Sequence, residues 1–200
     1  MLKLKEIVIG TYNNNKKTEI RKILNGIPVR LLDLDDFENP PDVIEDGVTF
    51  EDNATKKALE LAGFCQTCVM ADDSGLEVDA LDKCPGVLSS RYCGVDAGYE
   101  EKCLRLLEEL KGVPFEKRTA RFRCAIALAK PDRLRFVVSA SCEGIISNEP
   151  KGNNGFGYDP IFYVPEHELT MAELGSEVKN RISHRALALR LFNERLKELT

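Results

Sequence analysis

Two short segments of the chain combine residue types that suit a nucleotide. The segment 155–159 (GFGYD) places an aromatic ring between two glycines, with a carboxylate close by. Such a ring can stack on a purine base, whose edges also offer hydrogen-bonding groups. The segment 183–185 (SHR) lies where we expect a helix to begin, and basic side chains beside the free N–H groups of a helix start favour an anion. Together the two segments predict recognition of a base and of phosphate.

Three acidic residues could hold a divalent cation. Asp72 and Asp73 follow the apolar run 69–71, and Glu45 lies in an acidic segment. Mg²⁺ prefers carboxylate oxygens and shares its other positions with water and substrate phosphates. Successive side chains at a strand end point apart, so one aspartate can face a ligand while its neighbour binds backbone. Adjacent carboxylates are also common in surface turns, and their spacing alone leaves both interpretations open.

Other polar groups are less specific. The segment 11–16 (TYNNNK) connects the first predicted strand and helix, a place where open α/β sheets bind phosphate, but it lacks the P-loop spacing. A polar turn with a solvated lysine is the alternative. Asn53, Lys57 and Glu60 form a polar stripe at helical spacing, for which a solvated face is the simplest interpretation. Cys65 and Cys68 have no second pair at zinc-finger spacing, so we expect them to be structural.

Composition bounds the classes of function. The chain has 200 residues, 43% of them apolar and 30% charged, with a net charge of −5. That charge gives no support for nucleic-acid binding. The chain has neither an apolar run of the roughly 18 residues that a membrane helix needs nor a signal peptide. Seven cysteines without such a signal are typical of reduced thiols. We therefore expect a cytoplasmic protein that binds neither nucleic acid nor membrane.

The elements that must position these residues alternate between strand and helix. We expect strands at 5–11, 29–34 and 69–71, the last ending at Asp72, and helices at 15–24, 49–65 and 99–110. Apolar residues alternate on both sides of a turn at 130–132, which predicts an antiparallel hairpin. The closing helix, 183–199, is expected to bury Ala188, Leu191, Phe192, Leu196 and Leu199. This order predicts an α/β fold with a mixed sheet flanked by helices, in which any lobes share one core.

Seven segments then form one ordered pattern along nearly the whole chain. They are T-x-N-x-x-K at 11–16, E-x-G-x-T-F-x-D-N-A at 45–54, A-D-D-S-G-L at 71–76, P-G-V-x-S-x-R-Y at 85–92, A-R-F at 120–122, G-F-G-Y-D-P at 155–160 and K-x-x-I-S-H-R at 179–185. Each segment alone is weak, but the ordered set resembles the inosine triphosphate pyrophosphatases. These enzymes hydrolyse non-canonical purine nucleoside triphosphates to the monophosphate and pyrophosphate.

The resemblance implies a fold, an activity and a site. The fold would be one domain, 1–200, with a long mixed sheet in two lobes and an active-site cleft between them, usually as a homodimer. The activity would be Mg²⁺-dependent hydrolysis of ITP, dITP and XTP, which removes them from the nucleotide pool. Glu45 and Asp73 match the Mg²⁺ ligands, and Asp73 also matches the catalytic proton acceptor. Substrate contacts are implied for Thr11, Asn13, Lys16, Lys57, Ser74, Phe156, Gly157, Tyr158, Asp159, Lys179, His184 and Arg185.

Three positions depart from the family pattern. Tyr12 stands where glycine is frequent, and Asp52 stands where glutamate is usual. Asn153-Asn154 replaces a Thr-Gly type of pair, and we expect the turn to survive because asparagine tolerates left-handed backbone.

Other functions remain open at this stage. The closest alternative is a pyrophosphatase for modified pyrimidines or methylated nucleotides on a similar fold. From other classes, the chain could be a non-catalytic nucleotide sensor, which has little need of Glu45 with Asp73. It could also be a nucleic-acid-binding module, which the net charge of −5 disfavours.

Overall fold

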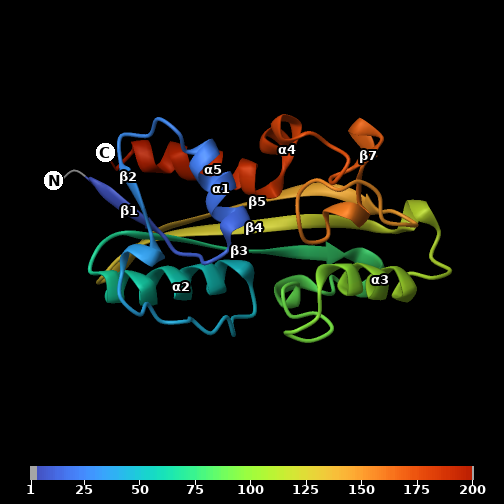
Figure 1. Ribbon diagram of the computed structural model, residues 1–200, viewed down its shortest axis with the longest axis horizontal. Coiled ribbons are helices and arrows are strands. Elements are labelled where there is room, and N and C mark those ends of the chain that lie inside the picture. Colours follow the sequence, from blue (N-terminus) through green and yellow to red (C-terminus); the bar gives the residue numbers. More distant parts are fainter. Residues whose placement is uncertain (1–3, 200) are drawn as a thin grey trace. The chain divides into compact units, whose positions relative to one another are not determined.

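The computed structural model describes residues 4–199, which form a mixed sheet of seven strands with five α-helices (Figure 1). The strands are β1 (Glu6–Ile9), β2 (Arg30–Asp33), β3 (Val69–Val78), β4 (Thr119–Lys130), β5 (Arg133–Ile146), β6 (Phe162–Val164) and β7 (Leu169–Thr170). The helices are α1 (Asn14–Ile23), α2 (Phe50–Cys65), α3 (Tyr99–Glu109), α4 (Ser176–Ile182) and α5 (His184–Lys197). The strand order is β2-β1-β3-β4-β5-β6-β7.

The pairing confirms the α/β class with a mixed sheet. Strand β1 pairs in parallel with β2 and β3, whereas β6 pairs antiparallel with β5 and β7. The two-residue turn between the neighbouring strands β4 and β5 confirms the hairpin. Helix α2 begins where expected because the Thr49 side chain accepts a hydrogen bond from the Asp52 amide and so caps it.

The prediction that the third strand ends at Asp72 is wrong. Strand β3 continues to Val78, with Asp72 and Asp73 inside it and both buried. An aspartate usually marks a turn because it competes for backbone hydrogen bonds or seeks water. Here Lys16 pairs with Asp72, and Asn53 donates a hydrogen bond to Asp73, so the backbone stays in the sheet.

The prediction for the closing helix is partly wrong. A separate helix, α4, precedes α5, and the cap residue Ser183 between them has an extended backbone. Ala188, Phe192 and Leu196 are buried as expected, but Leu191 is 41% exposed. The apolar face of α5 is therefore narrower than its composition indicates.

The residues fall into two compact units, and the buried apolar residues form two clusters. Of the described residues, unit 1 contains 4–73, 124–140 and 185–199, and unit 2 contains 74–123 and 141–184. The expectation of one shared core is therefore wrong. Along β3 the apolar run is interrupted at 72–74, so Met70 belongs to the unit 1 cluster and Leu76 to the unit 2 cluster.

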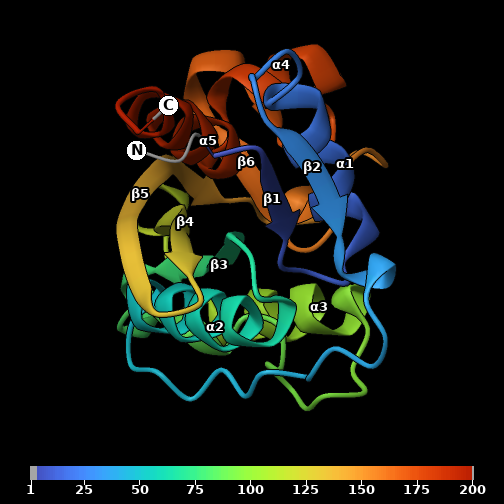
Figure 2. The same ribbon diagram turned by 90° about the vertical axis from the view of Figure 1, so that its left-hand side faces the viewer.

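Helices cover both faces of the sheet within each unit. In unit 1, α1 and α5 pack on one face through Ile20, Leu24 and Phe192, and α2 lies on the other face (Figure 2). In unit 2, α3 packs through Cys103 and Leu106, and α4 lies on the opposite face of the strands (Figure 1). Within residues 4–199, no helix has the length and apolar character needed to cross a membrane.

Candidate active site

Asp72 lies at the centre of a buried charge network in unit 1. Its side chain is 1% exposed, and Oδ2 lies 3.1 Å from Lys16 Nζ and 3.2 Å from Arg185 Nε. Burial alone would raise the pKa of this carboxyl, but the charges of Lys16, Arg185 and Lys57 outweigh burial and hold the pKa well below its usual range. Arg185 also pairs with Glu19 at 2.7 Å. Asp72 is therefore a fixed anion that holds cations in place.

Asp73, the next residue of β3, has the opposite electrostatic environment. Burial and the nearby charge of Glu45 raise its pKa to about 6, against an ordinary value of 3.8. Asn53 opposes this shift by donating a hydrogen bond from Nδ2 to Asp73 Oδ2 at 2.9 Å. A buried carboxyl with a pKa near neutrality is suited to accepting a proton.

Asn53 is a site residue that the sequence interpretation missed. It was expected on a solvated stripe, yet it is fully buried, whereas Glu60 on that stripe is exposed. Asn53 Oδ1 accepts a hydrogen bond from the Gly47 amide at 2.7 Å while its Nδ2 binds Asp73. One amide thus ties Asp73 to the segment that carries Glu45. In the sequence, the signal that could have identified Asn53 as a site residue was its position one helical turn before Lys57, a predicted substrate contact.

Lys57 pairs with Glu45 in the same part of unit 1. Burial would lower the pKa of the Lys57 ammonium, but Asp72, Glu45 and Asp73 outweigh burial and raise it. Lys57 therefore stays charged although its side chain is largely buried. We call Lys16, Glu45, Lys57, Asp72 and Asp73 the acid–lysine cluster.

The turn before α1 places Lys16 in this cluster. The Asn13 side chain caps α1 by accepting hydrogen bonds from the amides of Asn15 and Lys16 at 3.0 and 3.1 Å. Thr11 Oγ1 accepts a hydrogen bond from the Asn13 amide at 3.2 Å. Tyr12, one of the departures from the family pattern, donates a hydrogen bond from its hydroxyl to the Pro40 carbonyl at 3.0 Å. The added ring therefore attaches the turn to the acidic loop.

The donor set of the cluster fits Mg²⁺. Glu45 and Asp73 are carboxylates close enough for the charge of one to raise the pKa of the other, a cost that a divalent cation would remove. Within the described part of the chain, no three His, Cys, Asp or Glu side chains gather as a complete metal site. Mg²⁺ commonly uses only one or two protein carboxylates and takes its other ligands from water and phosphates.

In unit 2, the segment 155–159, which we call the base loop, carries Phe156. Asp159 Oδ2 accepts hydrogen bonds from the Phe156 amide at 2.8 Å and from Lys179 Nζ at 2.6 Å. Lys179 Nζ also lies 4.8 Å from the centroid of the Phe156 ring. Lys179 is therefore no ordinary surface lysine, because it is buried against the base loop. Its charge fixes the acid that holds the Phe156 backbone.

Tyr158 and Gly157 of the base loop lie beside Tyr99 of α3. Tyr158 is 2% exposed, and its hydroxyl donates a hydrogen bond to the Ser89 carbonyl at 2.9 Å. The edge of Tyr99 packs against the Tyr158 ring at a centroid distance of 5.5 Å. Tyr158 and Asp159 are therefore placed as supports of the loop, while Phe156 is only partly buried.

His184 lies elsewhere in unit 2, on an aromatic stack. Its ring stacks on Phe122 at a centroid distance of 4.8 Å, and Phe122 packs on Phe162 at 4.3 Å. Phe122 of β4 therefore sets the orientation of His184, a role that the alternating pattern of the strand does not reveal. Ser74 follows Asp73 on β3 and is partly exposed.

The turn before the base loop survives, but for a different reason than expected. Positive φ angles occur at Gly152, Gly155 and Gly157, and not at Asn153 or Asn154. Asn154 instead binds through its amide to the Ala172 carbonyl at 2.9 Å. The glycines alone carry the left-handed backbone.

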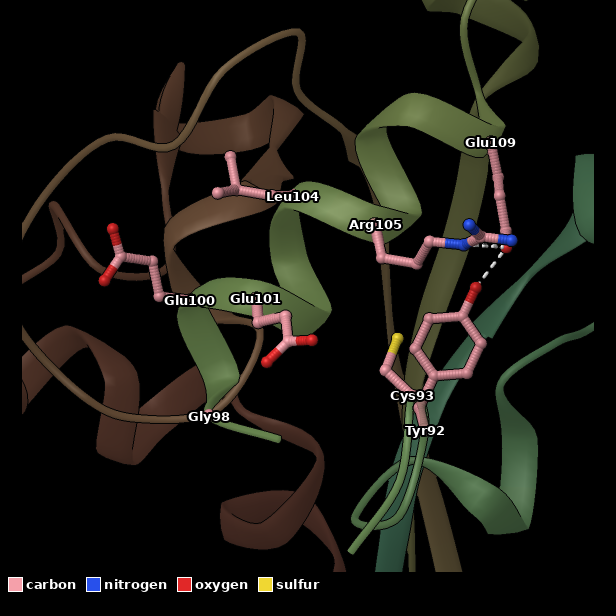
Figure 3. Close-up of a pocket in the computed structure, with 8 residues that line it drawn as sticks. All are labelled: Tyr92, Cys93, Gly98, Glu100, Glu101, Leu104, Arg105 and Glu109. Carbon is pink, nitrogen blue, oxygen red and sulfur yellow. Dashed lines mark hydrogen bonds and ion pairs between the residues drawn. The ribbon is translucent and has the colours of Figure 1, made fainter. Parts of the chain in front are cut away.

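A large cavity in unit 2, about 910 Å³, is a poor candidate for a triphosphate site (Figure 3). Glu100, Glu101 and Glu109 line it, and its only lining cation, Arg105, already pairs with Glu109 at 2.7 Å. Tyr92 also donates a hydrogen bond to Glu109. Uncompensated carboxylates repel a polyanion, so size alone does not identify the site.

Comparisons with known proteins agree with the sequence pattern. The sequence model of the Ham1 family matches residues 7–195 of this chain. A dITP/XTP pyrophosphatase of Geobacter sulfurreducens is 50% identical over 190 residues, 95% of this chain and 96% of that protein. One of Geobacillus kaustophilus is 50% identical over 196 residues, 98% of this chain and 96% of that protein.

Solved structures agree in fold. A HAM1 protein from Coxiella burnetii superposes with a TM-score of 0.90 at 40% identity, covering 98% of this chain and 100% of that one. The Staphylococcus aureus Ham1 protein gives 0.89 at 39% identity, with the same coverage of both chains. The resemblance seen in the ordered motifs is therefore confirmed, and the chain belongs to the Ham1 family.

Proposed function

We propose that this protein hydrolyses dITP, XTP and ITP to the nucleoside monophosphate and pyrophosphate, with Mg²⁺ as its cofactor. Its family and its near-full-length relatives make it a nucleoside triphosphate pyrophosphatase. The observation that carries the proposal is the acid–lysine cluster. There, a buried carboxyl with a pKa of about 6 lies among lysines that can bind phosphates. A non-catalytic sensor has no need of such a proton acceptor.

The cluster divides the chemistry among its side chains. Lys16 and Lys57 bind phosphate oxygens and hold the triphosphate, while Asp72 keeps Lys16 in place. Glu45 and Asp73 would hold Mg²⁺, which neutralises charge on the departing pyrophosphate. Asp73 orients a water molecule and accepts its proton as the oxygen attacks phosphorus. Asn53 keeps the Asp73 carboxylate in position.

The base loop supplies base recognition. Phe156 stacks on the purine, and the Asp159–Lys179 pair holds the loop backbone that presents it. A keto oxygen at the 6-position of hypoxanthine or xanthine accepts a hydrogen bond from a fixed donor. The amino group of adenine would leave that donor buried and unpaired, which lowers the rate for adenine nucleotides.

The direct test is a substrate panel with detection of pyrophosphate. With Mg²⁺, we expect dITP, XTP and ITP to be hydrolysed much faster than ATP or GTP, and modified pyrimidine or methylated nucleotides to be poor substrates. Release of orthophosphate would contradict the cleavage site, and equal rates on all nucleotides would contradict the specificity. Turnover without any divalent metal would contradict the assigned cofactor.

Asp73→Asn tests the proton acceptor. We expect turnover to fall by roughly 10²–10⁴-fold, the usual contribution of a general base. The matched control is Asp52→Asn, since Asp52 is exposed in the first turn of α2. Full activity in Asp73→Asn, with unchanged circular dichroism, would remove Asp73 from the mechanism.

We also propose a cytoplasmic homodimer that binds neither nucleic acid nor membranes. The net charge of −5 and the family support this proposal. Sedimentation equilibrium tests the dimer, and a salt-dependent gel shift with DNA or RNA would contradict the proposed lack of nucleic-acid binding.

A further inference from the structure

A second cavity, in unit 1, lies at the end of the β4–β5 hairpin. It has a volume of about 320 Å³ and combines a cationic rim with apolar walls. The cations are Lys130, Arg133 and Arg135, and the other lining residues are Leu4, Cys68, Leu128 and Leu199. We call this the basic cavity. None of these residues belongs to the acid–lysine cluster or to the base loop.

Within the described part of the chain, the three cations of the basic cavity have no carboxylate partner. Among residues 4–199, neither Lys130, Arg133 nor Arg135 forms an ion pair, although Asp132 lies between two of them in sequence. By contrast, Lys16, Lys57, Lys179 and Arg185 are all paired with acids. Three like charges around one hollow repel each other, and an anion bound there would relieve that repulsion.

The positive charge acts on the interior of the cavity. Burial raises the pKa of the Cys68 thiol, and the charges of Lys130 and Arg135 act in the opposite direction. These side chains are therefore close enough to act on a group in the cavity wall. Guanidinium and ammonium groups suit phosphate and carboxylate oxygens, whereas leucine side chains offer no partner to a polar ligand.

We propose that the basic cavity binds a small organic anion, made of a phosphate or carboxylate group on an apolar body. The charged group lies against Lys130, Arg133 and Arg135, and the apolar body packs on the partly exposed Leu4 and Leu199. A volume of about 320 Å³ is at the small end of ligand sites, which excludes a whole nucleoside triphosphate.

The basic cavity lies far from the acid–lysine cluster along β4. Lys130 is six residues from Cys124 on this strand, a distance of about 20 Å. Burial and the charge of Asp72 raise the pKa of the Cys124 thiol, so Cys124 lies near Asp72 of the acid–lysine cluster. The site is thus separate from the acid–lysine cluster.

Methyl NMR of the full chain locates the binding. Phenyl phosphate, benzoate and inorganic phosphate are titrated separately, each without Mg²⁺ or nucleotide. We expect phenyl phosphate to shift the methyl signals of Leu4, Leu128 and Leu199, and to leave Leu174 of unit 2 unchanged. Inorganic phosphate should bind more weakly because it has no apolar body. Comparison with benzoate tells whether phosphate or carboxylate is preferred.

Paired variants supply the decisive comparison. In Lys130→Gln/Arg135→Gln, we expect the affinity for phenyl phosphate to fall by at least about tenfold. In the control, Lys22→Gln/Arg195→Gln, the same charge is removed from exposed positions of unit 1, and affinity should stay within about twofold.

Two results would overturn the proposal. One is a set of cavity methyl signals that phenyl phosphate does not move. The other is equal affinity in the Lys130→Gln/Arg135→Gln variant and the wild type. Binding is measured without turnover, so neither result bears on the pyrophosphatase activity.

Discussion

Asp72 and Asp73 are identical residues at adjacent positions, and their surroundings give them opposite roles. Lys16 and Arg185 lower the pKa of Asp72, whereas burial and Glu45 raise the pKa of Asp73. Side chains alternate along a strand, so each aspartate meets a different set of neighbours. One carboxylate is thereby kept charged to hold cations, and the other can exchange a proton near neutral pH.

Asp73 makes the stability of the metal-free protein depend on pH. Its pKa of about 6 lies above the ordinary 3.8, so its stabilising contribution is complete below pH 3.8 and is lost as pH rises through 6. Asn does not titrate. We therefore expect Asp73→Asn to be more stable than the wild type at pH 8, by on the order of 1–3 kcal/mol.

Urea denaturation in EDTA measures this difference. At pH 4 the two proteins should be nearly equal, because Asp73 is then mostly protonated. Asp52→Asn, at an exposed position, should show no such pH-dependent gain. A wild type that is more stable than Asp73→Asn at pH 8 in EDTA would contradict the assigned environment of Asp73.

Asn53 links Asp73 to the loop of Glu45, so its removal should affect both folding and turnover. Asn53→Ala removes the hydrogen bonds that Asn53 makes with the Gly47 amide and with the Asp73 carboxylate, which we expect to cost about 1–3 kcal/mol. Turnover of dITP should fall at least about tenfold even under conditions where the variant is fully folded. Asn193→Ala on α5 is the control, and equal effects of the two substitutions would argue against a positioning role.

At the scale of elements, strand β3 and the base loop use opposite means to present their residues. Strand β3 holds two buried carboxyl groups within its length because Lys16 pairs with Asp72 and Asn53 donates a hydrogen bond to Asp73. The base loop has no ladder and depends on glycines together with the Asp159–Lys179 pair. The strand is therefore rigid through its backbone, and the loop through one buried carboxylate.

Gly155 provides the test of the loop. Its φ is +77°, and a Cβ there would clash with the Asp159 carboxylate. We expect Gly155→Ala to displace Phe156 and to lower kcat/KM for dITP on the order of 10–100-fold. Gly63→Ala within α2 has open space around its Cβ and should gain up to about 1 kcal/mol of stability without loss of activity. Unchanged kinetics in Gly155→Ala would show that the loop geometry is not required.

Across the whole molecule, the residues proposed for phosphate chemistry and those proposed for base recognition belong to different units. The acid–lysine cluster lies in unit 1, and Phe156 lies in unit 2. Lys57→Gln should lower kcat/KM for dITP and dUTP by the same factor, because both substrates carry the same triphosphate. The neighbouring Lys56→Gln is the control, since Lys56 pairs with Asp46 in a more exposed position.

Phe156→Ala should instead change the preference between bases. Loss of stacking is worth about 1–3 kcal/mol per base, and the smaller pyrimidine loses less of it. We therefore expect the ratio of kcat/KM for dITP over dUTP to fall, while Phe115→Ala leaves it unchanged. Equal losses on both substrates would place Phe156 outside base recognition.

The active-site cleft between the two lobes, which the family resemblance implies, stays a prediction.

The sequence by itself determined the first strands and helices, the hairpin and the family, because these depend on local periodicity and ordered motifs. It could not determine that β3 continues through Asp72 and Asp73, or that Asn53 is buried. Both facts depend on partners far away in the chain, such as Arg185, which lies 113 residues from Asp72. Only the tertiary structure brings these charges together, and the neighbouring charges then decide which of the two buried carboxyls keeps its proton.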